Sequence, residues 1–99
     1  MTADRTKLLT AYALAELDSL STAMRLLDDP PARLYALELN RAADEAALAW
    51  MRVSGIDGPL GIPNADHLLD MLVVQARTYL TEHARELDRV LAEIRGEEG

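Results

Sequence analysis

The sequence predicts an all-α fold, an antiparallel bundle of three long helices that associates further as a dimer. Leucine and alanine, which favour helices, dominate a chain that has no phenylalanine and few strand-forming residues. In three long segments, apolar residues recur at alternating steps of three and four, as they do along one side of an α-helix. Because such stripes are buried only against other helices, a bundle is the natural fold. The stripes are Thr10, Ala13, Leu17, Leu20, Met24 and Leu27; Tyr35, Leu39, Ala42, Ala46, Ala49 and Val53; and Val73, Ala76, Leu80, His83, Leu87, Val90 and Ile94.

The first helix is expected over about residues 3–28, where a pair of prolines ends it. Asp29 precedes Pro30, and a residue before proline is pushed out of the helical conformation. Pro31 is well tolerated in the first turn of the next helix. A connection this short makes the first two helices antiparallel neighbours.

The second helix is expected over about residues 31–54, with Gly55 suited to end it. One side of it carries a run of small residues, which let a neighbouring backbone approach closely. A bulky residue at Ala46 is therefore expected to cost about 1–3 kcal/mol through overpacking. The small residues are Ala42, Ala43, Ala46, Ala47 and Ala49.

Residues 55–63 are expected to form a loop, because three glycines and two prolines interrupt any regular element there. The loop contains three apolar residues, Ile56, Leu60 and Ile62. They favour one of two arrangements: the loop folds over the end of the bundle beside Trp50, or it contacts a partner. The third helix is expected over about residues 64–95, followed by a frayed tail at 96–99.

Size and charge restrict the function classes. Ninety-nine residues make one domain, and the absence of cysteine excludes disulfides and thiolate chemistry. The formal net charge of −7 disfavours direct binding to nucleic acid or to an anionic membrane. The acidity either keeps the protein in solution or is directed at a basic partner. No segment has the length of a membrane span, and the N-terminal residues lack the apolar stretch of a signal peptide, so a cytoplasmic protein is expected.

Few residues suggest reactive chemistry. His83 falls within the third stripe, which indicates a core histidine. His67 with Asp70, and His83 with Glu86, have a spacing of three, but both pairs lie on one helix and point in different directions, so no metal site is expected.

Glu38 and Glu45 lie on one side of the second helix, where Arg41 is spaced to pair with Glu45. An ion pair of this kind on the surface fits better than acid–base catalysis. No nucleotide-binding or nucleophile motif is present. We therefore expect no catalytic residues, no cofactor and no bound metal.

Each predicted helix carries apolar residues on a second side, more than one three-helix protomer can bury. Large exposed apolar patches mark interfaces, so we expect a two-fold dimer that uses the first helix and the start of the third. The residues expected at a protein interface are Leu8, Ala11, Ala15, Leu26, Leu37, Leu48, Leu68, Met71 and Val74.

These features favour a small acidic helical protein that acts as a regulator or adaptor by binding another protein. One alternative is an acidic inhibitor, as small phage proteins can be, that blocks a basic nucleic-acid-binding surface of its target. A further alternative is a binder of a small molecule or metal, with its pocket around Trp50, His83 and the loop. Salt-dependent affinity distinguishes the inhibitor, because charge attraction is screened.

Overall fold

The computed structural model describes residues 4–55 and 65–96, except for the side chains of residues 65–67. This part of the chain is helical and holds no strand, so the all-α prediction is confirmed. It contains four helices where the sequence predicts three. They are α1 (Arg5–Arg25), α2 (Pro30–Val53), α3 (Ala65–Glu82) and α4 (Ala84–Arg95).

Aspartates cap the first two helices at their amino ends. The side chain of Asp4 accepts hydrogen bonds from the backbone N–H groups of Thr6 and Lys7. Asp29 accepts one from the N–H of Ala32, and Pro30 and its successor occupy the first two positions of α2. These bonds satisfy amides that have no partner within the helix. The hinge at the proline pair is therefore where the sequence predicts it.

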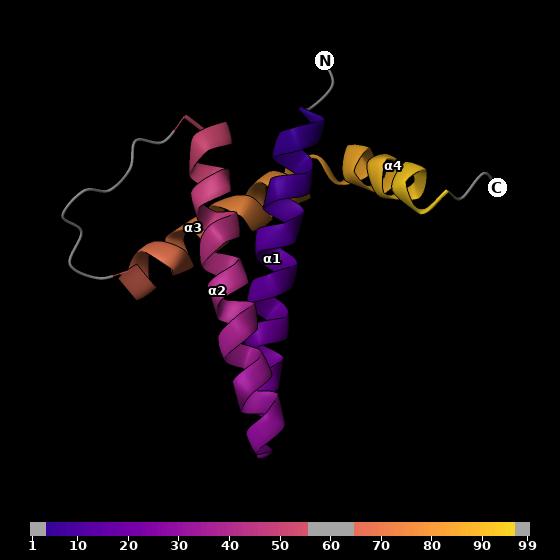
Figure 1. The fold of residues 1–99 in the computed structure, drawn as a ribbon. Coiled ribbons are helices and arrows are strands. Elements are labelled where there is room, and N and C mark those ends of the chain that lie inside the picture. Colours follow the sequence, from indigo (N-terminus) through magenta and orange to yellow (C-terminus); the bar gives the residue numbers. More distant parts are fainter. Residues whose placement is uncertain (1–3, 56–64, 97–99) are drawn as a thin grey trace.

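The helices are not aligned side by side along one axis, as the predicted three-helix bundle would require. Helices α1 and α2 form an antiparallel hairpin, and α3 crosses behind it near the end that holds the start of α1 (Figure 1). Helix α4 lies beyond α1, on the side away from α2. The opposite end of the hairpin, where α1 leads into α2, extends past α3 as two helices alone.

The core lies where α3 crosses the hairpin. Small residues let the helices approach closely there, as the alanine run of the second helix predicts, and Ala43 and Ala47 are both buried. The buried cluster comprises Ala11, Leu14, Ala43, Ala47, Trp50, Met51, Leu72, Val73 and Ala76. Burying these apolar side chains is the main source of stability.

The predicted stripes of the first two helices are not the buried faces. Of the twelve residues in them, Leu39 alone is buried, and the others are half-buried or exposed. The reason is that α1 packs against α2 and α3 on different sides. The side chain of Ser21 donates a hydrogen bond to the carbonyl of Ala36 on α2, whereas Arg77 of α3 contacts a different side of α1. The buried face of α1 is therefore rotated toward α3.

Arg77 attaches α3 to α1. Its guanidinium donates hydrogen bonds to the hydroxyl oxygen of Ser19 (2.7 Å) and to the carbonyl of Ala15 (3.4 Å). The carboxylate of Asp18 lies 3.6 Å away. One side chain thus contacts three acceptors within about one turn of α1 and ties α3 to the hairpin at this point.

The helix predicted over 64–95 is broken at His83, which corrects that prediction. His83 has a non-helical backbone (φ −120°, ψ 31°), and α4 starts at the next residue. The break lets α4 turn back toward α1, where Val90 is buried and Arg5 of α1 pairs with Glu93 at 2.7 Å. No glycine or proline marks the position, so the sequence pattern carries no signal for it.

Within the described residues, no helix combines the length and the apolar character that crossing a membrane requires.

Candidate interaction surface

Three residues predicted at an interface are instead buried within the chain. Leu8, Ala11 and Ala15 expose 1%, 0% and 6% of their surfaces. They appear as a second apolar stripe in the sequence because α1 packs against both α2 and α3. Their apolar character is explained by the fold, so they offer no surface to a partner.

The predicted residues Leu48 and Leu68 lie at a groove between α2 and α3. Leu48 is 53% exposed at its edge, while Leu68 is partly buried against the core. The groove has a volume of about 170 Å³, and its one charged lining residue is Asp44. The lining consists of Asp44, Ala47, Leu48 and Met51 from α2 and Leu68, Leu69 and Leu72 from α3. An apolar floor with a single carboxylate at the edge is suited to an apolar side chain of a partner.

The predicted residues Met71 and Val74 lie on the outer side of α3. Both are exposed, and they line a shallow hollow together with Asp70 and Gln75. Asp70 also lines a polar hollow with Asp18, Arg25, Asn40 and Leu69 at the point where α3 meets the hairpin.

The remaining predicted helix residues, Leu26 and Leu37, lie at the end of the hairpin that extends past α3 and are strongly exposed. They are not alone there. Other large apolar side chains at the same end are about half exposed or more, although three of them belong to the predicted stripes. These side chains are Leu20, Leu27, Leu34 and Tyr35, of which Leu34 lies outside the stripes.

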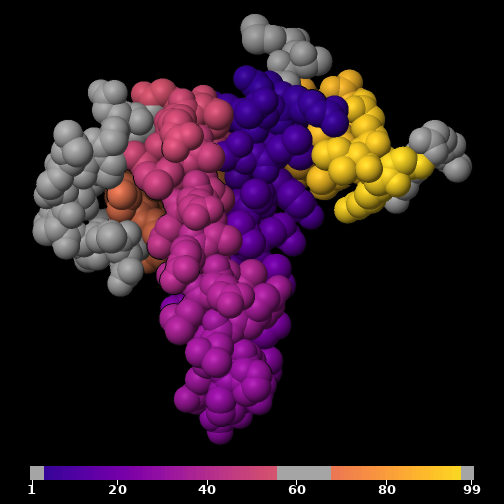
Figure 2. Space-filling view, in the orientation of Figure 1, coloured from indigo at the N-terminus to yellow at the C-terminus, as the bar shows by residue number. Residues whose placement is uncertain are grey.

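One whole face of the hairpin is left open. It carries the two predicted stripes, and no helix of the described chain covers it in the view of Figure 2, where α3 lies behind the hairpin. We call this surface the open hairpin face. Within it Leu39 is buried, and Leu17, Ala46 and Val53 pack partly against the core cluster, whereas Leu20, Leu27 and Tyr35 are the most exposed. The face consists of Thr10, Ala13, Leu17, Leu20, Met24, Leu27, Tyr35, Leu39, Ala42, Ala46, Ala49 and Val53.

An aromatic cluster connects the end of α3 with α2. The ring of Tyr79 meets Trp50 edge-on at 5.4 Å between centroids and stacks at 4.3 Å against His83. The ammonium of Lys7 lies over both Trp50 and Tyr79, at 5.5 and 4.8 Å from the ring centroids. The indole of Trp50 donates a hydrogen bond to the side chain of Gln75 (3.4 Å). These rings hold one another, so the cluster is a structural contact between α1, α2 and α3.

The surroundings of Tyr79 affect its titration. Burial raises the pKa of the phenol above the ordinary 10.0, and the carboxylates of Asp4 and Glu86 raise that pKa further. Each of these effects disfavours the phenolate.

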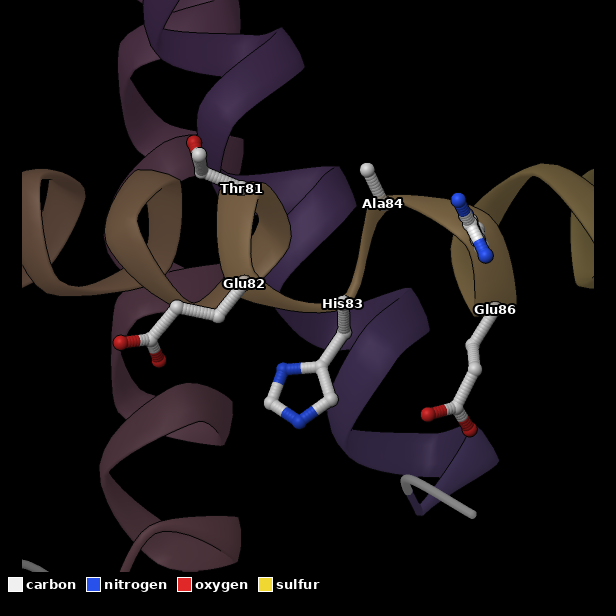
Figure 3. A pocket seen from close by; sticks show the side chains of 6 residues that line it. Thr81, Glu82, His83, Ala84 and Glu86 are labelled. Carbon is white, nitrogen blue, oxygen red and sulfur yellow. The ribbon is translucent and has the colours of Figure 1, made fainter.

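A shallow pocket of about 450 Å³ surrounds the break between α3 and α4 (Figure 3). Its lining includes Thr81, Arg85 and the residues between them. In the close view the side chains of Glu82, His83 and Glu86 point to one side of the chain, away from Thr81 and Ala84. The Nδ1 of His83 lies 2.9 Å from the carbonyl oxygen of Tyr79.

The other candidate groups do not come together in the described part of the chain. Glu38 and Glu45 are exposed on α2. No three histidine or acidic side chains among the described residues lie close enough to hold a metal ion. The side chain of His67 and the loop residues lie outside the described part, so the structure does not place them. The loop residues are Ile56, Leu60 and Ile62.

Most of the groove floor was not predicted. Met51, Leu69 and Leu72 fall in none of the predicted stripes, because the apolar pattern does not give the angle at which α3 crosses α2. Of the lining residues, Leu48 and Leu68 were predicted at an interface.

A comparison with known proteins finds no family model, no curated protein and no solved structure that matches the chain.

Proposed function

We propose that this chain is a non-catalytic protein-interaction module, a regulator or adaptor that binds another protein in the groove between α2 and α3. The observation that carries the proposal is the groove itself, with an apolar floor and the exposed Leu48 at its edge. In a monomer, the exposed Leu48 and the hollow beside it, lined by methionine and three further leucines, leave apolar surface in contact with water. A partner side chain that enters the hollow removes this apolar surface from water, which stabilises the complex.

The occupant suggested by the groove is an apolar side chain of a partner helix with basic residues beside it. The volume of about 170 Å³ suits one or two aliphatic side chains rather than a whole ligand. Asp44 lines the groove and the exposed Asp70 lies next to Leu69 and Met71. Carboxylates at the edge favour lysine or arginine on the partner and steer its approach.

The alternative of an acidic inhibitor that blocks a basic nucleic-acid-binding surface is less well supported. It needs a continuous run of carboxylates on the third predicted helix. Arginines interrupt that run on α3 and α4, and one of them, Arg77, is engaged with α1. The interrupting residues are Arg77, Arg85, Arg89 and Arg95.

The test is capture of a partner from a lysate of the source cells, in low and in high salt, by three forms of the protein. Leu48→Glu places a charge at the groove edge and is expected to lose the partner. Leu34→Glu is the matched control, because Leu34 is 66% exposed on α2 and does not line the groove. The control is expected to capture as much partner as the wild type.

The salt dependence separates the two candidates. Binding held by apolar contact survives high salt and is lost in Leu48→Glu. Capture that disappears in high salt and is indifferent to Leu48→Glu would instead favour the acidic inhibitor. We also propose that the chain self-associates, as the sequence predicts, but the binding of a partner in the groove does not depend on self-association.

A further inference from the structure

We propose that the open hairpin face binds the same face of a second copy of this chain, with the two hairpins antiparallel. This pairing extends the proposed function to a second surface, and it rests only on the proposed role of the chain in protein interaction. The groove between α2 and α3 would remain free in such a dimer, because it lies on another side of α2.

The open hairpin face points away from α3. On α1, the residues that contact α3 through Arg77 are Asp18 and its neighbours, whereas the stripe runs through Ala13, Leu17 and Leu20. At 3.6 residues per turn, the mean directions of these two sets differ by about half a turn. On α2, the residues that line the groove and the residues of the stripe also point in directions about half a turn apart around the helix axis. In Figure 2 α3 lies behind the hairpin, so the side opposite the Arg77 contact is the side toward the viewer.

The face is uncharged in a highly charged chain. None of its twelve positions carries an acid or a base, although 27% of the chain is charged and the net charge is −7. In an acidic protein, an uncharged face lets a second copy approach without repulsion between like charges. The acids nearest to this face stand at its borders, at Glu16, Glu38 and Glu45, and all three are exposed. An uncharged centre with a charged rim is typical of protein interfaces.

The sizes of the side chains favour the antiparallel orientation. Toward the hinge the face carries large residues, which include Leu20, Met24, Leu27 and Tyr35. Toward the other end it carries small ones, which include Ala13, Ala42, Ala46 and Ala49. Antiparallel pairing puts the large end of each copy on the small end of the other, whereas parallel pairing puts large on large and leaves a gap between the small ends. A two-fold axis across the middle of the hairpin makes both contacts at once.

The area of the open hairpin face corresponds to a weak, reversible pair. Eighteen helical steps from Tyr35 to Val53 on α2 rise about 27 Å, and two helices are about 20 Å wide, so the face covers about 500 Å² in projection on each copy. The pair would bury on the order of 1,000 Å², at the lower bound for a specific interface. Two hairpins packed in this way form a four-helix arrangement with α3 and α4 on the outside.

Sedimentation equilibrium over a range of concentrations tests the pairing with two matched variants. Leu20→Glu places a carboxylate on the open hairpin face, where the side chain is 45% exposed, so folding tolerates it. Leu34→Glu makes the same change on α2 at the same end of the hairpin, away from the face. We expect a dimer for the wild type and for Leu34→Glu, and a dissociation constant at least about tenfold higher for Leu20→Glu.

A strictly monomeric wild type at sub-millimolar concentration would overturn the proposal, as would equal weakening by the two variants. Circular dichroism confirms that both variants remain helical. The border acids add a second readout, because their mutual repulsion is screened by salt and the dimer is therefore expected to strengthen as salt is raised.

Disulfide trapping tests the orientation, and the chain has no cysteine of its own. Ala13→Cys and Met24→Cys stand at equal distances from the middle of the α1 stripe. Antiparallel pairing predicts that mixing the two variants gives mainly the mixed disulfide, because each cysteine meets the other position. Disulfides formed mainly between identical variants would contradict antiparallel pairing.

The outcomes separate this pairing from the proposed partner binding. Leu20→Glu leaves the groove intact, and Leu48→Glu leaves the open hairpin face intact. A chain that dimerises but captures no partner would contradict the groove alone, and a monomer that captures a partner would contradict the pairing alone.

Discussion

The ring of His83 stacks on Tyr79 at 4.3 Å, and its Nδ1 lies 2.9 Å from the carbonyl oxygen of the same residue. Because a carbonyl oxygen only accepts, Nδ1 carries the proton of this hydrogen bond. The same carbonyl also accepts from the backbone N–H of His83 at 3.1 Å. Both bonds hold His83 against the last turn of α3, at the residue where the backbone leaves the helical conformation. The contact between Tyr79 and His83 therefore lies at the break that divides the predicted third helix into α3 and α4.

The raised pKa of Tyr79 predicts a loss of stability at alkaline pH. In the unfolded chain the phenol ionises near its ordinary pKa of 10.0, whereas burial, Asp4 and Glu86 hold the folded pKa higher. The stability from this group is therefore complete below pH 10 and falls as the pH rises from there toward the folded pKa. Urea unfolding as a function of pH measures the decline, and Tyr79→Phe is expected to reduce it.

Absorbance of tyrosinate provides the direct check on Tyr79. The difference between the alkaline titrations of the wild type and of Tyr79→Phe isolates this one phenol of the three tyrosines. Its midpoint is expected above 10.0. A midpoint at or below that value would contradict the stated effect of burial and of the two carboxylates.

Close packing of the hairpin predicts that Ala43→Leu is destabilising. Ala43 is 1% exposed within the core cluster, so three additional carbon atoms have no space without moving a helix. The free energy of unfolding is expected to fall by about 1–3 kcal/mol. Ala23→Leu is the control, because Ala23 is exposed on α1 and the same change there meets solvent. Urea denaturation measures the free energy of unfolding of both variants. An equal decrease at the two sites would contradict close packing at Ala43.

The attachment of α3 to α1 predicts an energetic coupling between Arg77 and Ser19. Arg77→Met removes the hydrogen bonds to α1 while it keeps the length of the side chain. Because the arginine is half exposed, the expected loss is only about 1 kcal/mol. A double-mutant cycle with Ser19→Ala measures the shared part. Strictly additive effects would show that the 2.7 Å contact does not contribute to stability.

Local sequence signals predict the helical class and the hinge between the first two helices, but not the break between α3 and α4. Asp29 and the prolines after it place the hinge, and Leu and Ala composition gives the helical class. The same signals cannot give the angle at which α3 crosses the hairpin, since periodicity reports which residues are apolar and not which neighbour covers them. For this reason Leu8 and Ala11 were expected at a surface and are buried, while Leu20 and Tyr35 were expected in a seam and are exposed.

At the candidate surface, too, the sequence predicts features of a single helix but not contacts between helices. Leu48 and Leu37 stand among charged residues of α2, so their exposure could be predicted from the sequence. The floor of the groove could not, because Met51 and Leu72 meet only through the crossing of α2 and α3.

The most direct test of the account is photo-crosslinking in a lysate of the source cells, with p-benzoylphenylalanine in place of Leu48, Leu20 or Leu34 in three separate proteins. Partner binding in the groove predicts an adduct with another protein from position 48, and the pairing of two hairpins predicts an adduct of twice the 10.9 kDa chain mass from position 20. Position 34 is expected to give neither. A protein adduct no stronger at position 48 than at position 34 would contradict the central claim that the groove between α2 and α3 binds a partner.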